Sequence, residues 1–330
     1  MSITLKDIAK KVGVSTSTIS KAVNNRPGVS NQLRNRILET ISQMNLQPKQ
    51  HVGGLIKNNI ISVNLLVRIN QSINDDPFYS LITEGLSKEL QDSKINLLYN
   101  VLRENKLSDS IFNELFKEKE ISGAILIGAD YDSELLNQIS QMEIPAILID
   151  NKHPGFSWVN SNNYHGAVQA INHLNKLGHS KIAFLAGPLN HNSIAERFQG
   201  YSDLVNNKPN LIESSGVSVD DGYQAIKSYQ KIDFTALFAA TDKLAIGAIK
   251  SLKERGFKVP ADISIIGFDD IEWAVHTEPS LTTIKVAKQQ IGMLAAQLFK
   301  DLYQNNNFHQ VEINVQTKLI KRNSTGPLLK

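Results

Sequence analysis

The chain has 330 residues, of which 41% are hydrophobic and 20% are charged, an ordinary composition for globular proteins and a length for about two or three domains. It contains no cysteine, which excludes disulfides and thiolate metal sites, and no apolar run is long enough to span a membrane. The start of the chain has no signal-peptide pattern, so we expect a cytoplasmic protein with no membrane partner.

The net charge of +3 conceals an asymmetry along the chain. Residues 1–58 carry nine Lys and Arg side chains and two acidic ones, a net charge of +7, so residues 59–330 carry −4. A basic head on a mildly acidic body is typical of a nucleic-acid-binding protein whose body binds another partner. Charge alone leaves a solvated basic surface as an alternative.

Three short helices are expected in the basic head. The first covers residues 5–12, can be capped by Thr4 and ends at Gly13, while the second and third can be capped by Ser15 and Ser30. Apolar residues recur at helical spacing in each helix, so the three apolar stripes can close one small core.

The first two helices have the spacing of a helix-turn-helix motif. A short turn containing Gly13 joins them, and Ala9 stands four positions earlier, where a small residue lets the helices approach. In this motif the second helix enters the DNA major groove, so we expect Thr16, Ser17 and Lys21 to face base edges and phosphates. An ordinary three-helix cap on an enzyme is the alternative interpretation.

The stretches "TLKDIAKKVGVSTSTISKAVNN" and "VSNQLRNRILETI" resemble the N-terminus of the LacI/GalR family of bacterial transcriptional regulators. The resemblance implies that the base-reading positions are Thr16, Ser17 and Lys21. It implies that the phosphate-binding positions are Thr4, Ser15, Asn24 and Ser30.

The segment after the third helix departs from the family pattern. Relatives have Tyr-x-Pro-Asn followed by a short helix whose leucine wedges into the minor groove, whereas this chain has "LQPKQHVGGL". Leu55 matches the wedge. Gly53 and Gly54 each cost about 1 kcal/mol relative to Ala in a helix, so we expect a weak hinge helix, with a flexible linker as the alternative.

After the hinge, short apolar runs alternate with amphipathic stretches, which predicts strands of parallel sheets covered by helices on both faces. Two such series, separated near residues 157–166, indicate two doubly wound lobes, and ligands of such sheets bind beyond the carboxyl ends of the strands. The runs lie at residues 60–67, 95–100, 123–128, 145–150, 181–187, 236–241 and 264–270.

Polar residues follow several of these strands. Asp150, Thr241 and Asp269 stand at strand ends, and Ser193 and Arg197 lie one helical turn apart. Carboxylates bind sugar hydroxyls, and an arginine fork orients a hydroxyl, carboxylate or phosphate, so the set suits a hydrophilic small ligand. No catalytic or metal-binding spacing and no phosphate or dinucleotide loop occurs, so we expect no catalytic residue, metal or cofactor.

Two further acidic residues are expected to support the fold and not to contact the effector. Asp242 is interpreted as the N-cap of the helix that follows it, and Asp270 as a residue that holds the next loop.

The body resembles the same family through "DPFYSLITEGL", "RFQGY", "ATDKLAIGAI" and "VPADISIIGFDD". The implied fold is a small all-α helix-turn-helix DNA-binding domain plus an α/β periplasmic-binding-protein-like core of two doubly wound, Rossmann-like lobes. Thr241 replaces an Asn of many sugar-responsive members, and Asn162 replaces an Asp. The effector contacts that the resemblance implies are Phe78, Asp150, Ser193, Arg197, Thr241 and Asp269.

The expected division is a DNA-binding domain over residues 1–45, a hinge over 46–58 and a core over 59–330. Lobe one would comprise about 59–159 and 286–316, and lobe two about 160–285 and 317–330. The chain lacks the family's leucine-heptad tail, which favours a dimer, and Gln297 replaces a key Arg of the branch regulated by a phosphoprotein.

The expected function is an effector-responsive repressor of a carbohydrate-utilisation operon, with double-stranded operator DNA, a sugar-like effector and a second copy of the chain as partners. A solute-binding or enzymatic Rossmann-like protein is the alternative. Because a cleft carboxylate rarely supports a core, the sequence predicts that Asp269→Ala removes the ligand response and leaves the fold intact.

Overall fold

The computed structural model describes residues 5–23, 28–43, 61–68, 77–102, 107–117, 121–128, 131–205, 208–305 and 310–328. The chain divides into two compact units, Met1–Ile61 and Ser62–Lys330. None of the helices in the described ranges is long and apolar enough to cross a membrane. Five residues discussed above lie outside the described ranges: Thr4, Asn24, Gly53, Gly54 and Leu55.

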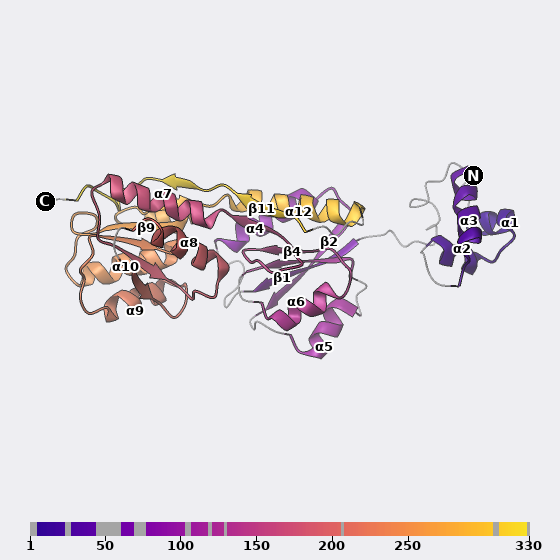
Figure 1. Cartoon of the computed structure of the whole chain (residues 1–330), viewed down its shortest axis with the longest axis horizontal. Coiled ribbons are helices and arrows are strands. Elements are labelled where there is room, and N and C mark those ends of the chain that lie inside the picture. The colour runs from indigo at the N-terminus through magenta and orange to yellow at the C-terminus, as the bar shows by residue number, and fades with distance from the viewer. Residues whose placement is uncertain are drawn as a thin grey trace. The chain divides into compact units, whose positions relative to one another are not determined.

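The described part of the first unit consists of α1 (Leu5–Val12), α2 (Thr16–Val23) and α3 (Asn31–Gln43), shown in Figure 1. Gly13 ends α1 with φ +78°, a conformation that glycine adopts without steric cost. The N–H groups of Gly13 and Val14 both donate to the carbonyl oxygen of Ala9, at 2.9 and 3.0 Å. The predicted turn between the first two helices is therefore confirmed.

Hydroxyl caps start the second and third helices, as predicted. The Ser15 Oγ accepts a hydrogen bond from the N–H of Thr18 at 3.1 Å, and the Ser30 Oγ accepts one from Leu33 at 3.3 Å. The three helices share one small core, whose buried side chains are Ile8, Ala9, Val12, Ile19, Ala22 and Ile37.

Lobe one of the second unit is built on a sheet with the strand order β11-β5-β4-β3-β1-β2. Its described pairings from β1 through β3, β4 and β5 to β11 are parallel, with Leu65 opposite Ile125 and Leu126 opposite Leu148. Its strands are β1 (Ile61–Arg68), β2 (Ile95–Leu102), β3 (Gly123–Ile127), β4 (Ala146–Ile149), β5 (Ser157–Ser161) and β11 (Glu312–Val315). Its helices are α4 (Tyr79–Leu90), α5 (Asp109–Phe112), the π-helix η2 (Asn113–Lys117), α6 (Ser133–Ser140) and α12 (Lys288–Asn305).

Lobe two has the strand order β12-β10-β9-β8-β6-β7, in which the short β12 runs antiparallel to β10 and the other described pairings are parallel. Its strands are β6 (Ile182–Ala186), β7 (Asn210–Glu213), β8 (Ala236–Ala239), β9 (Ser264–Asp269), β10 (Thr282–Lys285) and β12 (Lys318–Ile320). Its helices are α7 (Asn163–Lys176), α8 (Asn192–Ser202), α9 (Val219–Ser228), α10 (Asp242–Glu254) and α11 (Trp273–His276).

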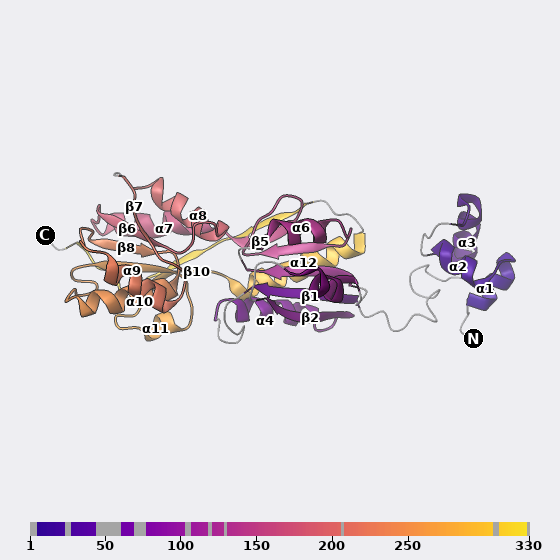
Figure 2. The same cartoon turned by 90° about the horizontal axis from the view of Figure 1, so that it is seen from below.

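The chain passes between the lobes three times, from β5 to α7, from β10 to α12 and from β11 to β12. Residues 157–166, expected to separate two series of strands, form β5 and the start of α7, so the first crossing between the lobes lies within them. Figures 1 and 2 both show α12, which comes late in the chain, beside α4 in lobe one. Each lobe is therefore assembled from segments that are far apart in the sequence.

Helices α4 and α12 touch backbone to backbone at two glycines. A methyl group added to Gly292 would overlap the carbonyl oxygen of Ile82, and one added to Gly85 would overlap that of Gln289. Both helices begin beside residues of the candidate site described below, so this contact fixes the site's framework.

We expect Gly292→Ala to lower the free energy of unfolding by about 1–3 kcal/mol, because the added methyl group overpacks the contact between α4 and α12. In an unconstrained helix the same change stabilises by about 1 kcal/mol, so the sign of the effect is diagnostic. Urea unfolding measures it. Gly326→Ala is the control, since its methyl group would meet Pro260 at an ordinary 3.4 Å. A stabilised Gly292→Ala variant would contradict the close packing.

Two buried histidines hold the C-terminal segment against lobe two. The His173 Nε2 lies 3.1 Å from the Thr325 Oγ1, and the His179 Nε2 lies 3.0 Å from the carbonyl oxygen of Gly326. Burial lowers the pKa of both imidazoles. The folded state therefore resists protonation more than the unfolded chain, in which the imidazole pKa is about 6.5.

This pKa shift predicts that the two histidines make the protein less stable as the pH falls below about 6.5, because the unfolded chain then takes up protons that the folded core refuses. Unfolding curves at neutral pH and at pH 5.5 would show a smaller acid-induced loss in a His173→Gln/His179→Gln variant than in the wild type. His276→Gln, at an exposed position, is the control. An identical acid-induced loss of stability in all three proteins would show that His173 and His179 do not cause it.

Candidate effector site and DNA-binding helix

The structure brings four of the six predicted effector residues together where strands of both lobes end. Asp150 follows β4 in lobe one, and Asp269 ends β9 in lobe two. Ser193 and Arg197 lie on α8, both buried, one turn apart as predicted.

Arg197 is the centre of this group. Only 3% of its surface is exposed, and its Nη2 lies 3.4 Å from the Asp269 Oδ1. Its Nε donates to the Asn163 Oδ1 at 3.0 Å, and its Nη1 donates to the carbonyl oxygen of Ala240 at 2.6 Å. The guanidinium also stacks on the Phe268 ring, 3.7 Å from the ring centroid. Asp269 is thus half of a buried ion pair, which changes the effect expected of Asp269→Ala.

Asp150 faces the same guanidinium from lobe one. Its Oδ2 accepts a hydrogen bond from the Tyr79 hydroxyl at 2.9 Å, and its φ of +60° is fixed by a hydrogen bond from its own N–H to the Asn160 Oδ1 at 2.7 Å. Burial raises the pKa of the Asp150 carboxyl, while the positive charge of Arg197 and hydrogen bonds from Tyr79 and Ser193 oppose the rise.

Lys288, at the start of α12, was missed by the sequence analysis. It is 5% exposed, and its ammonium donates to the carbonyl oxygens of Asp269 and Asp270. Its Nζ lies 5.9 Å from the ring centroid of Phe78, a predicted effector residue at the start of α4. Burial lowers the pKa of Lys288, and the charge of Asp269 counteracts this. Lys288 thus lies between the Phe78 ring of lobe one and the backbone of Asp269 and Asp270 in lobe two.

The interpretation of Asp242 as an N-cap is wrong. Thr241 is the N-cap of α10, and its Oγ1 accepts a hydrogen bond from the N–H of Leu244 at 3.2 Å. Asp242 is the first helical residue, fully buried, and accepts hydrogen bonds from the Ile271 N–H at 2.9 Å and from the Thr283 hydroxyl. Burial, and then the negative charge of Asp269, raise the pKa of Asp242.

Asp270 was interpreted as a residue that holds the next loop, but its carboxylate contacts a side chain of the C-terminal segment. Its carboxylate pairs with Arg322 at 2.6 Å, and Arg322 also donates to the carbonyl oxygen of Leu281. Asp270 therefore ties the C-terminal segment to the end of β9 and lies outside the group around Arg197.

Polar contacts join the lobes next to the site. Lys152, from the segment between β4 and β5, forms an ion pair with Glu196 of α8 and lies 4.4 Å above the Trp158 ring. The Asn192 Nδ2 donates to the Asn151 Oδ1 at 3.0 Å. These contacts hold α8 against lobe one.

The predicted base-reading residues share the exposed face of α2. Thr16, Ser17 and Lys21 are exposed, and the Ser17 Oγ lies 2.7 Å from the Oγ of Ser15, which is also exposed. Ser30 is exposed at the start of α3. The predicted DNA contacts Thr4, Asn24 and Leu55 lie outside the described residues.

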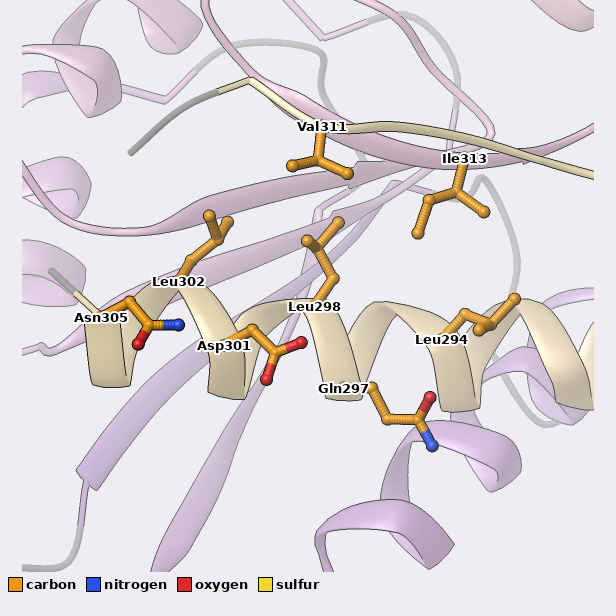
Figure 3. A pocket seen from close by; sticks show the side chains of 8 residues that line it. All are labelled: Leu294, Gln297, Leu298, Asp301, Leu302, Asn305, Val311 and Ile313. Atoms are coloured by element: carbon orange, nitrogen blue, oxygen red, sulfur yellow. The ribbon is translucent and has the colours of Figure 1, made fainter. Parts of the chain in front are cut away.

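A groove of about 460 Å³ lies apart from this site, between α12 and β11. Figure 3 shows Leu298 and Leu302 of the helix pointing toward Val311 and Ile313 of the strand. Gln297 and Asp301 line the groove as well, and its lining residues in the described part of the chain include no basic side chain. The groove contributes nothing to the group around Arg197.

Two family models match the chain. The model of bacterial regulatory proteins of the lacI family matches residues 4–49, and the model of a periplasmic binding protein-like domain matches residues 171–325. The chain belongs to the LacI family. Its fold is the helix-turn-helix domain plus two-lobed α/β core that the sequence predicted.

Relatives within the LacI family align along the chain. The HTH-type transcriptional repressor PurR of Proteus mirabilis is 28% identical over 99% of this chain and 98% of its own length. A LacI family regulator of Enterococcus faecalis V583, solved with bound ribose, is 26% identical with a TM-score of 0.73, over 81% of this chain and 100% of its own. The lac repressor dimer bound to operator and the anti-inducer ONPF shares the fold, with 24% identity, a TM-score of 0.73 and coverage of 99% and 100%.

Proposed function

We propose that this LacI-family protein is an effector-responsive repressor that binds double-stranded operator DNA as a homodimer. The proposal rests on two features of one chain. The first unit has an exposed face of hydroxyl and lysine side chains on α2, and the separate two-lobed unit has a buried charged site. One unit suits DNA and the other a small ligand, and a ligand that favours one arrangement of two lobes can change DNA affinity. The repressor names of its relatives support this function.

The DNA-binding part is proposed to comprise residues 1–45, with 46–58 as the hinge and 59–330 as the effector core. Bases would be read by Thr16, Ser17 and Lys21, which can reach the major groove from α2. The minor-groove wedge would be Leu55. Phosphates would be held by Thr4, Ser15, Asn24 and Ser30.

The effector is proposed to be a sugar or sugar derivative, and the regulated genes a carbohydrate-utilisation operon. Two carboxylates, Asp150 and Asp269, and the Ser193 hydroxyl offer partners for several sugar hydroxyls. Phe78, before α4, and Thr241, the N-cap of α10, are the remaining proposed contacts. A purine is the second candidate, because the relatives carry the name PurR. The two carboxylates and the hydroxyl of the site accept hydrogen bonds from, or donate them to, several ligand hydroxyls, which favours the sugar.

The homodimer is supported by exposed apolar side chains on α11. Trp273 is 45% exposed and Val275 is 51% exposed, and such neighbouring apolar groups are typical of protein interfaces. We further propose a cytoplasmic protein, associated with the nucleoid when bound to DNA, that has no enzymatic activity.

Calorimetric titration with ribose, cellobiose and guanine tests the effector proposal. We expect a sugar to bind and Ser193→Ala to weaken its binding about tenfold, because the Ser193 hydroxyl is a proposed hydrogen-bond partner of the effector. Ser228→Ala, an exposed change on α9, should leave the affinity unchanged. Binding of guanine in place of both sugars would move the assignment to a purine. Sugar binding that Ser193→Ala does not affect would remove this site from the proposal.

A further inference from the structure

The turn that follows β9 has a backbone conformation that needs support. The φ of Asp269 is +113° and that of Asp270 is +52°, and neither residue is glycine. Residues with a side chain rarely adopt such angles, which persist only where the surrounding structure holds them. The contacts that hold residues 269–271 therefore determine where the Asp269 carboxylate lies in the candidate effector site.

Lobe two holds the N–H groups of this turn. The N–H of Ile271 donates to the Asp242 Oδ2 at 2.9 Å, and the N–H of Asp270 donates to the Thr283 Oγ1 at 3.4 Å. The Thr283 hydroxyl in turn donates to Asp242, which is fully buried. Because α10 and β10 belong to lobe two, these contacts fix the turn within its own lobe.

A side chain of lobe one holds the carbonyl oxygens of the same turn. Lys288 is the first residue of α12, and its buried ammonium donates to the carbonyl oxygens of Asp269 and Asp270, the latter at 3.1 Å. An ammonium has three donors, so one lysine can bind both oxygens at once. An apolar side chain at this position would remove that partner from both oxygens. Lys288 therefore ties the turn of lobe two to lobe one.

The two close glycine contacts between α12 and α4 leave these helices little room to slide past each other. Phe78 precedes α4, and its ring centroid lies 5.9 Å from the Lys288 Nζ. Tyr79 begins α4, and its hydroxyl donates to the Asp150 Oδ2 at 2.9 Å. A shift of residues 269–270 that moves Lys288 is therefore passed to both helices and to the lobe-one side of the site.

We propose that Lys288 is a positioning residue that couples effector binding at Asp269 to the arrangement of the two lobes, which rests on the effector function proposed above. An effector that hydrogen-bonds the Asp269 carboxylate binds best where Lys288 holds the turn, so it favours the arrangement of the lobes in which Lys288 reaches both carbonyl oxygens. A ligand shifts an equilibrium between two arrangements by its difference in affinity for them, and this contact creates that difference.

Spin-label distance measurements on the full chain test the tie between the lobes. The chain has no cysteine, so Ser133→Cys on α6 and Ser228→Cys on α9, both at exposed positions, place one label in each lobe. Excess unlabelled chain removes distances between two copies. Lys288→Met should broaden or shift the distance distribution. Lys285→Met, which removes the same charge from a side chain that is 56% exposed on β10, should not.

An unchanged distance distribution in folded Lys288→Met would overturn the proposal, because the lobes would then keep their arrangement without the tie. Circular dichroism shows whether the variant is folded. If Lys288→Met does not fold, Lys288→Gln, whose side chain is shorter and uncharged, replaces it with the same expected result.

Operator binding with and without ribose measures the coupling itself, by fluorescence anisotropy with a duplex from the DNA flanking the protein's own gene. Saturating ribose should change the operator affinity of the wild type and of Lys285→Met at least about fivefold, and that of Lys288→Met less than about twofold. A loss of stability alone would leave this ratio unchanged. A full response in Lys288→Met would overturn the proposal. If ribose leaves the wild type unchanged, the proposed sugar effector fails, and the distance measurement still decides the role of Lys288.

Discussion

Asp269→Ala is expected to lower the free energy of unfolding of the core by roughly 3–5 kcal/mol, the usual cost of leaving a buried charge without its partner. Arg197, buried under Phe268, loses the carboxylate 3.4 Å from its Nη2. The φ of Asp269 is +113°, which a side chain such as alanine adopts only with strain. The ligand response should disappear as well, because the carboxylate is a proposed effector contact.

Two companion variants separate the loss of the ion pair from the backbone strain. Urea unfolding measures the stability of all three variants. Asp269→Gly removes the carboxylate but accepts the positive φ, so the difference between glycine and alanine measures the strain. Asp269→Ala/Arg197→Met removes both charges, and we expect it to recover part of the lost stability. A single Asp269→Ala variant as stable as the wild type would show that the pair does not support the core.

Lys21→Ala is expected to weaken operator binding by roughly 100-fold and to relax base preference, because a base contact is worth about 1–3 kcal/mol and a dimer makes it twice. Lys21 is exposed in the last turn of α2, on the proposed recognition helix. Fluorescence anisotropy with operator duplexes substituted at single positions measures affinity and preference together.

Lys10→Ala is the matched control, since it removes the same charge from an exposed position on α1. Both variants should reduce the salt dependence of binding slightly, but the control should keep its base preference. If Lys21→Ala discriminated among the substituted duplexes as strongly as the wild type does, the role of α2 as the recognition helix would be refuted.

The local structure of the head could be predicted because short-range rules determine it. Gly13 ends α1 through its positive φ, and Ser15 and Ser30 cap the next helices with their own hydroxyls. These interactions join residues within a few positions of one another, so the sequence pattern contains them.

Several strands of the core could not be predicted, because tertiary neighbours create them. β5 has the polar sequence "SWVNS" yet is buried between β4 and β11, and β11 comes from a segment about 150 residues later. β10 and β12 pair with each other in lobe two, although the chain between them passes through lobe one. Without alternating apolar residues, such strands give little signal of their own.

The sequence predicted the site residues that stand at strand ends, but it did not predict the residues that hold them in place. Asp150 and Asp269 follow long apolar runs, which place them at the edge of a sheet. Tyr79, Asn163 and Lys288 acquire their roles through contacts with Asp150, Arg197 and the Asp269 backbone, across large sequence separations. The one signal for Lys288 is a lysine in the first turn of a helix that is otherwise apolar on its inner face.

Sequence-specific DNA binding is the central claim, and a competition titration tests it most directly. A labelled duplex from the DNA flanking the protein's own gene is bound by the full chain and displaced by unlabelled flanking or scrambled duplex at physiological salt. We predict that the flanking duplex competes at least about 1,000-fold better than the scrambled one, the low end of specific recognition. Equal competition by both duplexes would contradict the claim, because binding would then rest on phosphate contacts alone.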